Sequence, residues 1–224
     1  MKCSLCNTTI KDKKTDSQGK KYHICNKCEL IQLDKSFYLS SEKEKQRYEL
    51  HENGTNNKGY INYLNNIISN SVTPFLKPGD RLLDFGCGPE KIWANILKGK
   101  GISVSTFDPF FDNNNGWINK NYNLITAIEV FEHLTSPAKD LEILSNCLGT
   151  GNYLIIRTML HNNNWETFTK WWYKDDPTHV SFYSRKTINF ICRNWNYQLV
   201  QITDNCEIVL MKKTSRGKKS LTPT

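Results

Sequence analysis

A short apolar run that ends in an acidic residue and two glycines constrains this chain most: Arg81-Leu82-Leu83-Asp84-Phe85-Gly86-Cys87-Gly88-Pro89. The apolar run indicates a buried strand. The two glycines allow a tight turn and a close approach of the backbone to a ligand. In a doubly wound sheet such a turn lies at the carboxyl end of a strand, where ligands bind. The segment therefore predicts a parallel sheet with a ligand site at one edge.

Strand-like and helix-like stretches alternate after this point. Strands are expected at 81–85, 102–107, 124–129 and 153–158, the last after a turn at 149–151, and helices at 91–97, 138–148 and 187–195. Two further strands, 197–203 and 207–211, are expected to pair as a hairpin about Asp204-Asn205. This alternation indicates an α/β fold with a Rossmann-like, doubly wound, mostly parallel sheet and a terminal antiparallel strand.

Asp108 follows the second expected strand. A carboxylate at this place suits the two hydroxyls of a ribose. A dinucleotide fingerprint would need a third glycine, but the chain continues Gly88-Pro89-Glu90-Lys91, and the acid at Glu90 would repel a phosphate. An NAD-dependent dehydrogenase is therefore the least favoured interpretation.

With these features the sequence resembles class I S-adenosylmethionine-dependent methyltransferases over about residues 58–211. Their first motif reads acid-x-Gly-x-Gly, and their segment after the fourth strand commonly reads E-V-x-E-H, as residues 129–133 do. Residues 108–111 and 176–183 are similar to a bacterial subgroup that carries an N-terminal zinc-binding cysteine module. The resemblance implies S-adenosylmethionine as cofactor and these cofactor-binding residues: Asp84, Gly86, Cys87, Gly88, Asp108, Pro109 and Glu129. The loop at residues 88–91 departs from the G-P-G-P of many relatives.

Methyl transfer from a sulfonium mainly needs positioning of the acceptor, and a base is needed only when the acceptor must lose a proton. The catalytic candidates are His179, His133 and Glu132. The run Glu129-x-x-Glu132-His133 resembles the metal-binding E-x-x-E-H of ubiquinone-biosynthesis O-methyltransferases and small-RNA 2′-O-methyltransferases. An alternative role is therefore Mg²⁺ or Mn²⁺ binding at Glu129, Glu132 and His133, with His179 as an added ligand. The aromatic residues around His179 either wall a substrate pocket or belong to the core, with His179 bonding locally.

Two C-x2-C pairs stand near the N-terminus, Cys3 with Cys6 and Cys25 with Cys28. Four thiolates close a tetrahedral structural zinc site, with a hairpin tip expected at Ser17-Gln18-Gly19 between the pairs. About thirty residues cannot build an adequate core alone, so zinc would supply folding free energy. His23 is assigned to the surface of the module. A redox pair is disfavoured because the βαβ context is missing.

The expected organisation is a zinc-binding module at 1–33, a helical linker at 34–72, a methyltransferase domain at 73–212 and a basic disordered tail at 213–224. The net charge of +8 lies at the two ends of the chain. No apolar run is long enough to span a membrane, and no secretory signal is visible, so a cytoplasmic location with reduced thiols is expected.

Three functions remain open for the whole chain. The first is a methyltransferase for a small metabolite, a sugar derivative or a lipid-linked precursor. The second is an RNA or protein methyltransferase that docks through the zinc module and the basic ends. The third is a non-catalytic zinc adaptor on a degenerate methyltransferase fold. The acceptor and the oligomeric state are not determined by the sequence.

Overall fold

The computed structural model describes residues 1–50, 58–203 and 208–215. Its centre is a six-stranded sheet in the order β10-β11-β7-β6-β4-β5. The strands β4, β5, β6 and β7 pair in parallel, whereas β11 pairs antiparallel with β7 and with β10. Their bounds are β4 Arg81–Phe85, β5 Ser103–Phe107, β6 Tyr122–Ile128, β7 Leu148–Arg157, β10 Tyr197–Ile202 and β11 Ile208–Lys213. The mostly parallel sheet and its antiparallel edge confirm the expected fold class.

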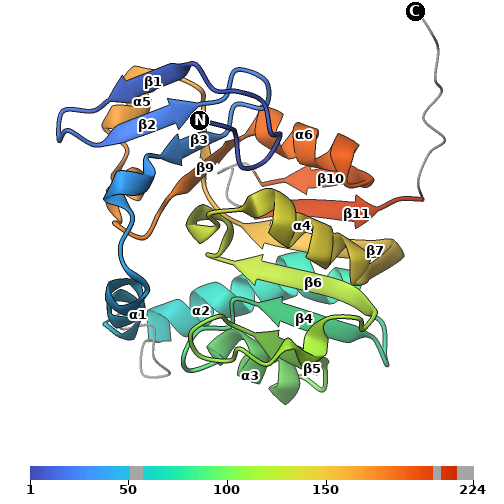
Figure 1. The fold of residues 1–224 in the computed structure, drawn as a ribbon. Helices are drawn as coiled ribbons and strands as arrows, with labels where there is room; N and C mark the ends of the chain where they lie inside the picture. The colour runs from blue at the N-terminus through green and yellow to red at the C-terminus, as the bar shows by residue number, and fades with distance from the viewer. Residues whose placement is uncertain (51–57, 204–207, 216–224) are drawn as a thin grey trace, which may run out of the picture.

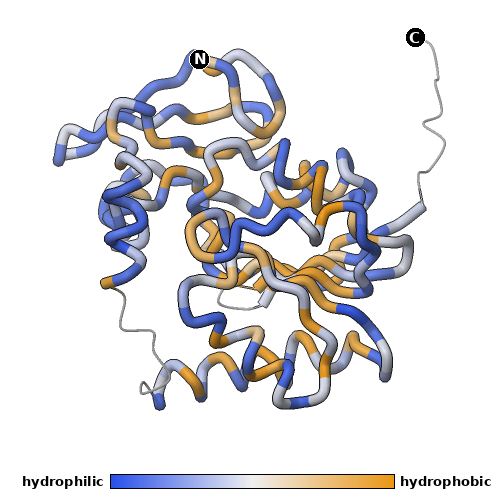
Figure 2. The backbone as a smooth tube through the Cα atoms, turned by 60° about the horizontal axis from the view of Figure 1, so that its bottom comes forward, coloured by the Kyte–Doolittle hydropathy of each residue, from blue (hydrophilic) through white to orange (hydrophobic). Residues whose placement is uncertain are grey.

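Helices cover both faces of this sheet (Figure 1). The apolar side chains of α2 (Lys58–Ile67) and α3 (Ile92–Gly99) pack with one face, together with the π-helical turn Ile68–Val72. Those of α4 (Pro137–Asn146) and α6 (Arg185–Asn194) pack with the other. Figure 2 shows the apolar strands running between these layers. Such two-sided burial is the reason that parallel strands read as continuous apolar runs.

A second sheet joins the N-terminal residues to the late part of the chain. Its order is β1-β2-β3-β9-β8, with bounds β1 Asp12–Thr15, β2 Lys21–Ile24, β3 Ile31–Leu33, β8 Leu160–His161 and β9 Ser181–Ser184. Ile31 pairs with Phe182 and Gln32 with Ser181. The short helix α5 (Trp165–Thr169) contributes Phe168 to the apolar cluster on this sheet. The N-terminal strands therefore share a sheet and a core with residues 160–184.

The helix α1 (Ser41–Glu49) links the two sheets in sequence and buries none of its residues. Ser40 caps it by accepting a hydrogen bond from the backbone of Lys43, as N-cap serines do. Two of its contacts are aromatic: the ring of Tyr48 lies 5.8 Å from that of Phe110 and 5.4 Å from that of His133. Thus α1 is a polar helix that contacts the site loops through Tyr48 and through Arg47, whose guanidinium lies 3.4 Å from the carboxylate of Asp176.

Most expected elements occur within a few residues of their predicted bounds, including the hairpin tip between β1 and β2. The prediction of a turn at residues 149–151 is wrong, because β7 begins at Leu148 and includes Gly149 and Gly151. The pairing of β6 with β7 shifts register between Tyr122 and Leu124. The two strands therefore remain paired on both sides of the glycine-containing stretch. The hairpin turn about Asp204-Asn205 and most of the basic tail lie outside the described residues. Within the described residues no helix is long and apolar enough to cross a bilayer.

Candidate functional site

The glycine turn after β4 has the tight geometry that its sequence predicts. Gly86 and Gly88 have φ of +84° and +65°, a region that favours glycine. The backbone amides of Gly86 and Cys87 both donate to the carbonyl of Phe107, at 2.7 and 3.0 Å. A Cβ at Gly86 would collide with Val130, whereas a Cβ at Gly88 would meet open space. Gly86 is therefore needed for packing, and Gly88 borders space that a ligand could occupy.

Asp108 organises this turn through its carboxylate. Oδ2 accepts a hydrogen bond from the amide of Gly88 at 3.0 Å. Oδ1 accepts from the amides of Phe110 and Phe111 at 2.9 and 3.1 Å. Asp108 and the glycine turn are thus brought together, and Pro109 lies in the same loop. The ribose role of Asp108 stays a prediction.

Asp84 is a buried carboxylate at the end of β4. Its Oδ2 has no hydrogen-bond partner among the described residues, and the residue is 2% exposed. Burial, together with the negative charge of Asp108, raises the pKa of Asp84 to about 8. An unpartnered buried carboxyl is costly, so this position favours a cationic ligand group at the edge of the sheet.

Lys91 ends the loop at residues 88–91, where the sequence departs from the G-P-G-P of many relatives. This residue is the N-cap of α3 and has φ of +50°, where a glycine would be less strained. Its ammonium lies 2.8 Å from Asp112, which also accepts a hydrogen bond from Thr106 at 2.6 Å. The ion pair anchors the start of α3 to the loop that follows β5.

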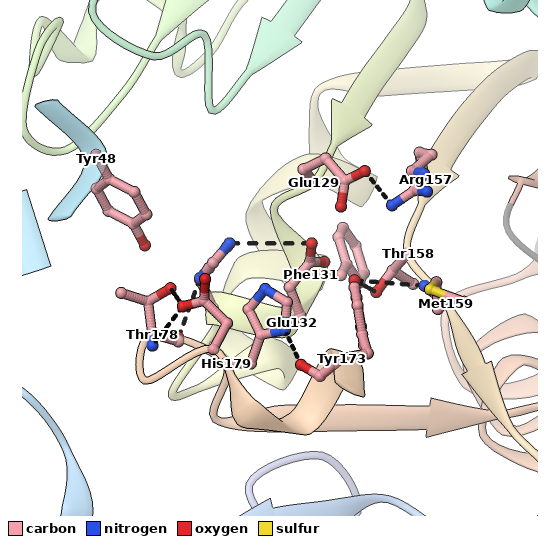
Figure 3. A network of polar contacts seen from close by, with 12 residues as sticks. Tyr48, Glu129, Phe131, Glu132, Arg157, Thr158, Met159, Tyr173, Thr178 and His179 are labelled. Atoms are coloured by element: carbon pink, nitrogen blue, oxygen red, sulfur yellow. Dashed lines mark hydrogen bonds and ion pairs between the residues drawn. The ribbon is translucent and has the colours of Figure 1, made fainter. Parts of the chain in front are cut away.

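Glu129 follows β6 and pairs with Arg157 at the end of β7 (Figure 3). Glu129 has φ of +57°. Burial and the nearby charge of Glu132 raise the pKa of Glu129 to about 8. The ring of Tyr63, on α2, lies 5.9 Å from the guanidinium of Arg157. Sequence reasoning missed Arg157 and Tyr63, because neither stands within a recognisable motif.

Glu132, His133 and His179 form a compact cluster. One ligand atom from each lies within 4.8 Å of the others. Nδ1 of His133 bonds to the carbonyl of Thr178 at 3.0 Å, and Nδ1 of His179 bonds to the carbonyl of Tyr173 at 2.6 Å. Burial lowers the pKa of His179 to about 4 and also lowers that of His133. All three catalytic candidates from the sequence are therefore brought together.

The magnesium or manganese ligand set expected at Glu129, Glu132 and His133 is not brought together in this form. The carboxylate of Glu129 pairs with Arg157, and the third member of the observed cluster is His179. Replacing a carboxylate by an imidazole also changes the preferred metal, because Mg²⁺ favours oxygen ligands.

The aromatic residues near His179 divide between core and site. Phe182 is fully buried in the apolar cluster of the second sheet, and Trp171 packs against that cluster. Trp172 is 67% exposed. Tyr173 contacts the cluster directly, its ring centroid 4.3 Å from that of His179. Trp171 and Phe182 therefore belong to the core, and Tyr173 borders the site.

The four N-terminal cysteines converge as their spacing predicts. The sulfur atoms of Cys3 and Cys28 are 3.6 Å apart and those of Cys6 and Cys25 are 3.4 Å apart, with all four within 4.8 Å. A disulfide would require about 2.05 Å, whereas thiolates on one zinc ion are separated by about 3.8 Å. His23 bonds instead to Asp34 at 2.7 Å, so it lies outside this ligand set.

Comparison with known proteins places the chain in a family. Residues 60–202 match the family described as a methyltransferase domain. No curated protein matches the sequence significantly. A SAM-dependent methyltransferase from Archaeoglobus fulgidus has a similar structure, with a TM-score of 0.50, 17% identity and coverage of 68% of this chain and 92% of that chain.

An O-methyltransferase family protein from Burkholderia thailandensis is similar as well, with a TM-score of 0.50, 10% identity and coverage of 78% and 64% of the respective chains. At these identities the two structures show a shared fold. The family match itself spans more than half of the chain and contains the glycine turn, Asp108 and the Glu132–His133–His179 cluster. The chain therefore belongs to the methyltransferase domain family.

Proposed function

We propose that the chain transfers the methyl group of S-adenosylmethionine to a small-molecule acceptor, such as a metabolite, a sugar derivative or a lipid-linked precursor. One observation supports this function above the others. The unpartnered carboxyl of Asp84 and the open space at Gly88 lie on the same sheet edge as Glu129 and the histidine cluster. A cationic cofactor and an acceptor would meet along that edge.

The residues of the glycine turn would hold the cofactor. A cofactor that carries both an ammonium and a sulfonium group would favour the ionised form of Asp84, and Gly88 leaves room for its backbone contacts. Asp108 already fixes the amide of Gly88, and a ribose would share that carboxylate. When bound, S-adenosylmethionine supplies an activated methyl carbon and a neutral thioether leaving group. The protein then has only to align the acceptor and exclude water.

The side chains proposed to face the acceptor are buried, which favours a small acceptor over a macromolecule. Glu132 is fully buried, and His179 and Tyr173 are 8% and 2% exposed. With their lowered pKa values, His133 and His179 are neutral at neutral pH, so either ring could accept a proton from an acceptor. A polynucleotide or protein would have to present a thin projecting group to reach these atoms.

We also propose a structural zinc ion at Cys3, Cys6, Cys25 and Cys28. The sulfur separations fit a tetrahedral ion, and all four positions would be filled by protein, as in structural sites. The zinc module also contacts the methyltransferase domain: Thr187 donates to the carbonyl of Cys28 at 2.8 Å, and Ser184 donates to Glu29 at 3.0 Å. These contacts support a role in building the domain more than a role in docking a partner.

Calorimetric titration with S-adenosylhomocysteine, with NAD⁺ as the control ligand, tests the proposed function. We expect binding of S-adenosylhomocysteine alone, and a loss of affinity in Asp108→Ala with the fold retained by circular dichroism. Binding of NAD⁺ alone would overturn the methyltransferase proposal. Binding of neither would favour the non-catalytic adaptor. Tight, salt-sensitive RNA binding by the wild type would favour the nucleic-acid alternative.

A further inference from the structure

A polar cavity lies on the second sheet, where the N-terminal strands meet the loop between β8 and α5 (Figure 1). Its volume is about 230 Å³. Drug-sized ligands occupy pockets of about 300–1,000 Å³, so this cavity fits a small ligand or one ring of a larger one. None of its described lining residues belongs to the glycine turn or to the Glu132–His133–His179 cluster. The cavity is therefore separate from the candidate active site.

The base of the cavity is a cross-strand row on one face of the sheet. Asp12 on β1 pairs with Ile24 on β2, and Ile24 pairs in turn with Ile31 on β3. Residues paired in this way point to the same face. The two isoleucines are 9% and 2% exposed and belong to the apolar cluster that includes Phe168. The base is thus apolar and rests on a packed core.

Trp165 forms an aromatic wall of the cavity. Its ring stacks on that of Phe168, with centroids 5.6 Å apart and an interplanar angle of 22°, and it meets the edge of Tyr22 at 5.9 Å. These contacts fix the ring, yet Trp165 is only half-buried. An aromatic side chain that is held in place and partly exposed is a platform on which the C–H face of a ring-shaped ligand can pack.

The polar groups of the lining make few contacts of their own. Among the described residues, the side chains of Asp12, Asn26 and Asn163 have no hydrogen bond or ion pair, and both asparagines are exposed. The ammonium of Lys14 lies 5.5 Å from the centroid of the Trp165 ring. Lys14 and Asp12 are the two charged residues of the lining. Their charges cancel, so the cavity offers hydrogen-bonding groups without a net charge.

This combination restricts the chemistry of a ligand. An asparagine amide both donates and accepts hydrogen bonds, a carboxylate only accepts and an ammonium only donates. Hydroxyl groups match all three. A purely apolar ligand would bury the amides without partners, an anion would meet Asp12, and a cation would meet Lys14. An uncharged ring with several hydroxyls and one apolar face satisfies every part of the lining.

We propose that this cavity binds one ring of an uncharged carbohydrate. The C–H face of the ring would pack on Trp165, and its hydroxyls would bond to Asp12, Asn26 and Asn163. The ring is either a free monosaccharide or one unit of a longer glycan, because the exposed asparagines leave the rim open. The site does not depend on methyl transfer, so it stands or falls apart from the proposed function.

Titration followed by ¹H–¹⁵N NMR tests the site on the full chain purified with Zn²⁺. The probes are glucose, galactose, mannose and N-acetylglucosamine, each as the free sugar and as the methyl glycoside, with inorganic phosphate as the charged control. The chain has six tryptophans, and Trp165→Phe and Trp172→Phe identify two of the indole N–H signals by their loss. We expect one or more sugars to shift the Trp165 signal with a dissociation constant of about 1–10 mM. The signal of Trp172, which is 67% exposed, should not move.

Asn163→Gly is the most informative variant. Asn163 has φ of +58°, which glycine adopts without strain, so the change removes the amide and keeps the loop. We expect the affinity for the best sugar to fall about 3–10-fold, as for the loss of one hydrogen bond. Asn196→Gly is the matched control, because Asn196 has φ of +56° and lies outside the cavity. Its affinity should equal that of the wild type.

Trp165→Ala should abolish saturation transfer from the protein to the sugar, because the platform is removed. Asn163→Gly decides the outcome if Trp165→Ala does not fold. Binding of the methyl glycosides as well as the free sugars supports a glycan unit as ligand, and binding of free sugars alone supports a monosaccharide. A Trp165 signal that no sugar shifts would overturn the proposal. So would equal affinities in Asn163→Gly and Asn196→Gly, or tighter binding of phosphate than of every sugar.

Discussion

The ammonium of Lys174 lies 3.1 Å from the carboxylate of Asp16, with both side chains almost fully buried. Asp16 belongs to the turn between β1 and β2, and Lys174 lies five residues before His179. The other oxygen of Asp16 accepts hydrogen bonds from the amides of Gln18 and Lys20. The pair thus ties the N-terminal hairpin to the loop that presents His179.

Removing one partner of this pair should be more harmful than removing both. We expect Lys174→Met to lower the free energy of unfolding by about 3 kcal/mol, because it leaves Asp16 buried without a counter-ion. The double variant Asp16→Asn, Lys174→Met should recover part of that loss. Denaturant unfolding measures both. Strictly additive losses would show that the two side chains are not energetically coupled.

Replacing Asp84 should stabilise the fold and weaken binding of the cofactor product. Its folded pKa of about 8 exceeds the unfolded value of about 3.9. The stability that comes from keeping it protonated is therefore fully present below pH 4 and is lost as pH rises toward 8. We expect Asp84→Asn to be more stable than the wild type by at least about 1 kcal/mol at pH 8. Affinity for S-adenosylhomocysteine should fall.

The measurement for Asp84 is denaturant unfolding of both proteins at pH 5 and pH 8. The wild type and the variant differ in one titrating group, so their difference removes the contribution of all others. A stability difference of the same size at both pH values would contradict the shifted pKa.

The two turn glycines should respond differently to alanine. At Gly86 the new methyl group collides with Val130, so we expect Gly86→Ala to destabilise the chain by about 2 kcal/mol. Gly88→Ala meets open space and should cost about 1 kcal/mol from backbone strain, with a larger effect on cofactor affinity. Adding Val130→Ala should rescue Gly86→Ala in part, because the strain of a φ of +84° remains, and should leave Gly88→Ala unchanged. Rescue of both, or of neither, would contradict the collision.

Loss of zinc from the cysteine cluster should weaken the whole chain. Cys3, Cys25 and Cys28 belong to the same apolar cluster as Tyr183 and Ile188. We therefore expect Cys25→Ser to release zinc and to lower the midpoint of the main unfolding transition, not only that of an N-terminal step. Cys147→Ser is the control, because Cys147 is buried in the same apolar cluster but is not one of the four converging cysteines. Zinc content that stays unchanged in Cys25→Ser would refute the ligand set.

The sequence predicted those features that depend on local chemistry. The glycine turn at Gly86 and Gly88, the strand before it and the converging cysteines all follow from residue type and spacing over short stretches. It could not predict that Glu129 pairs with Arg157, because these partners meet only after the strands are ordered. The grouping of His179 with Glu132 and His133 was expected, but only from the resemblance of residues 129–133 to a known motif. The strand β9 was not predicted for a similar reason. Ser181 and Phe182 pair with β3, which is far away in sequence, and no local pattern indicates a strand there.

That distant pairing also affects the order of folding. Strands β1 to β3 leave the ribosome about 150 residues before β9, which at typical rates of synthesis is a delay of about 7–30 s. During this interval the N-terminal hairpin lacks its sheet partner, and β3 exposes an unpaired edge. Early capture of a metal ion by the four cysteines would hold the nascent hairpin in a closed form until its partner strand emerges.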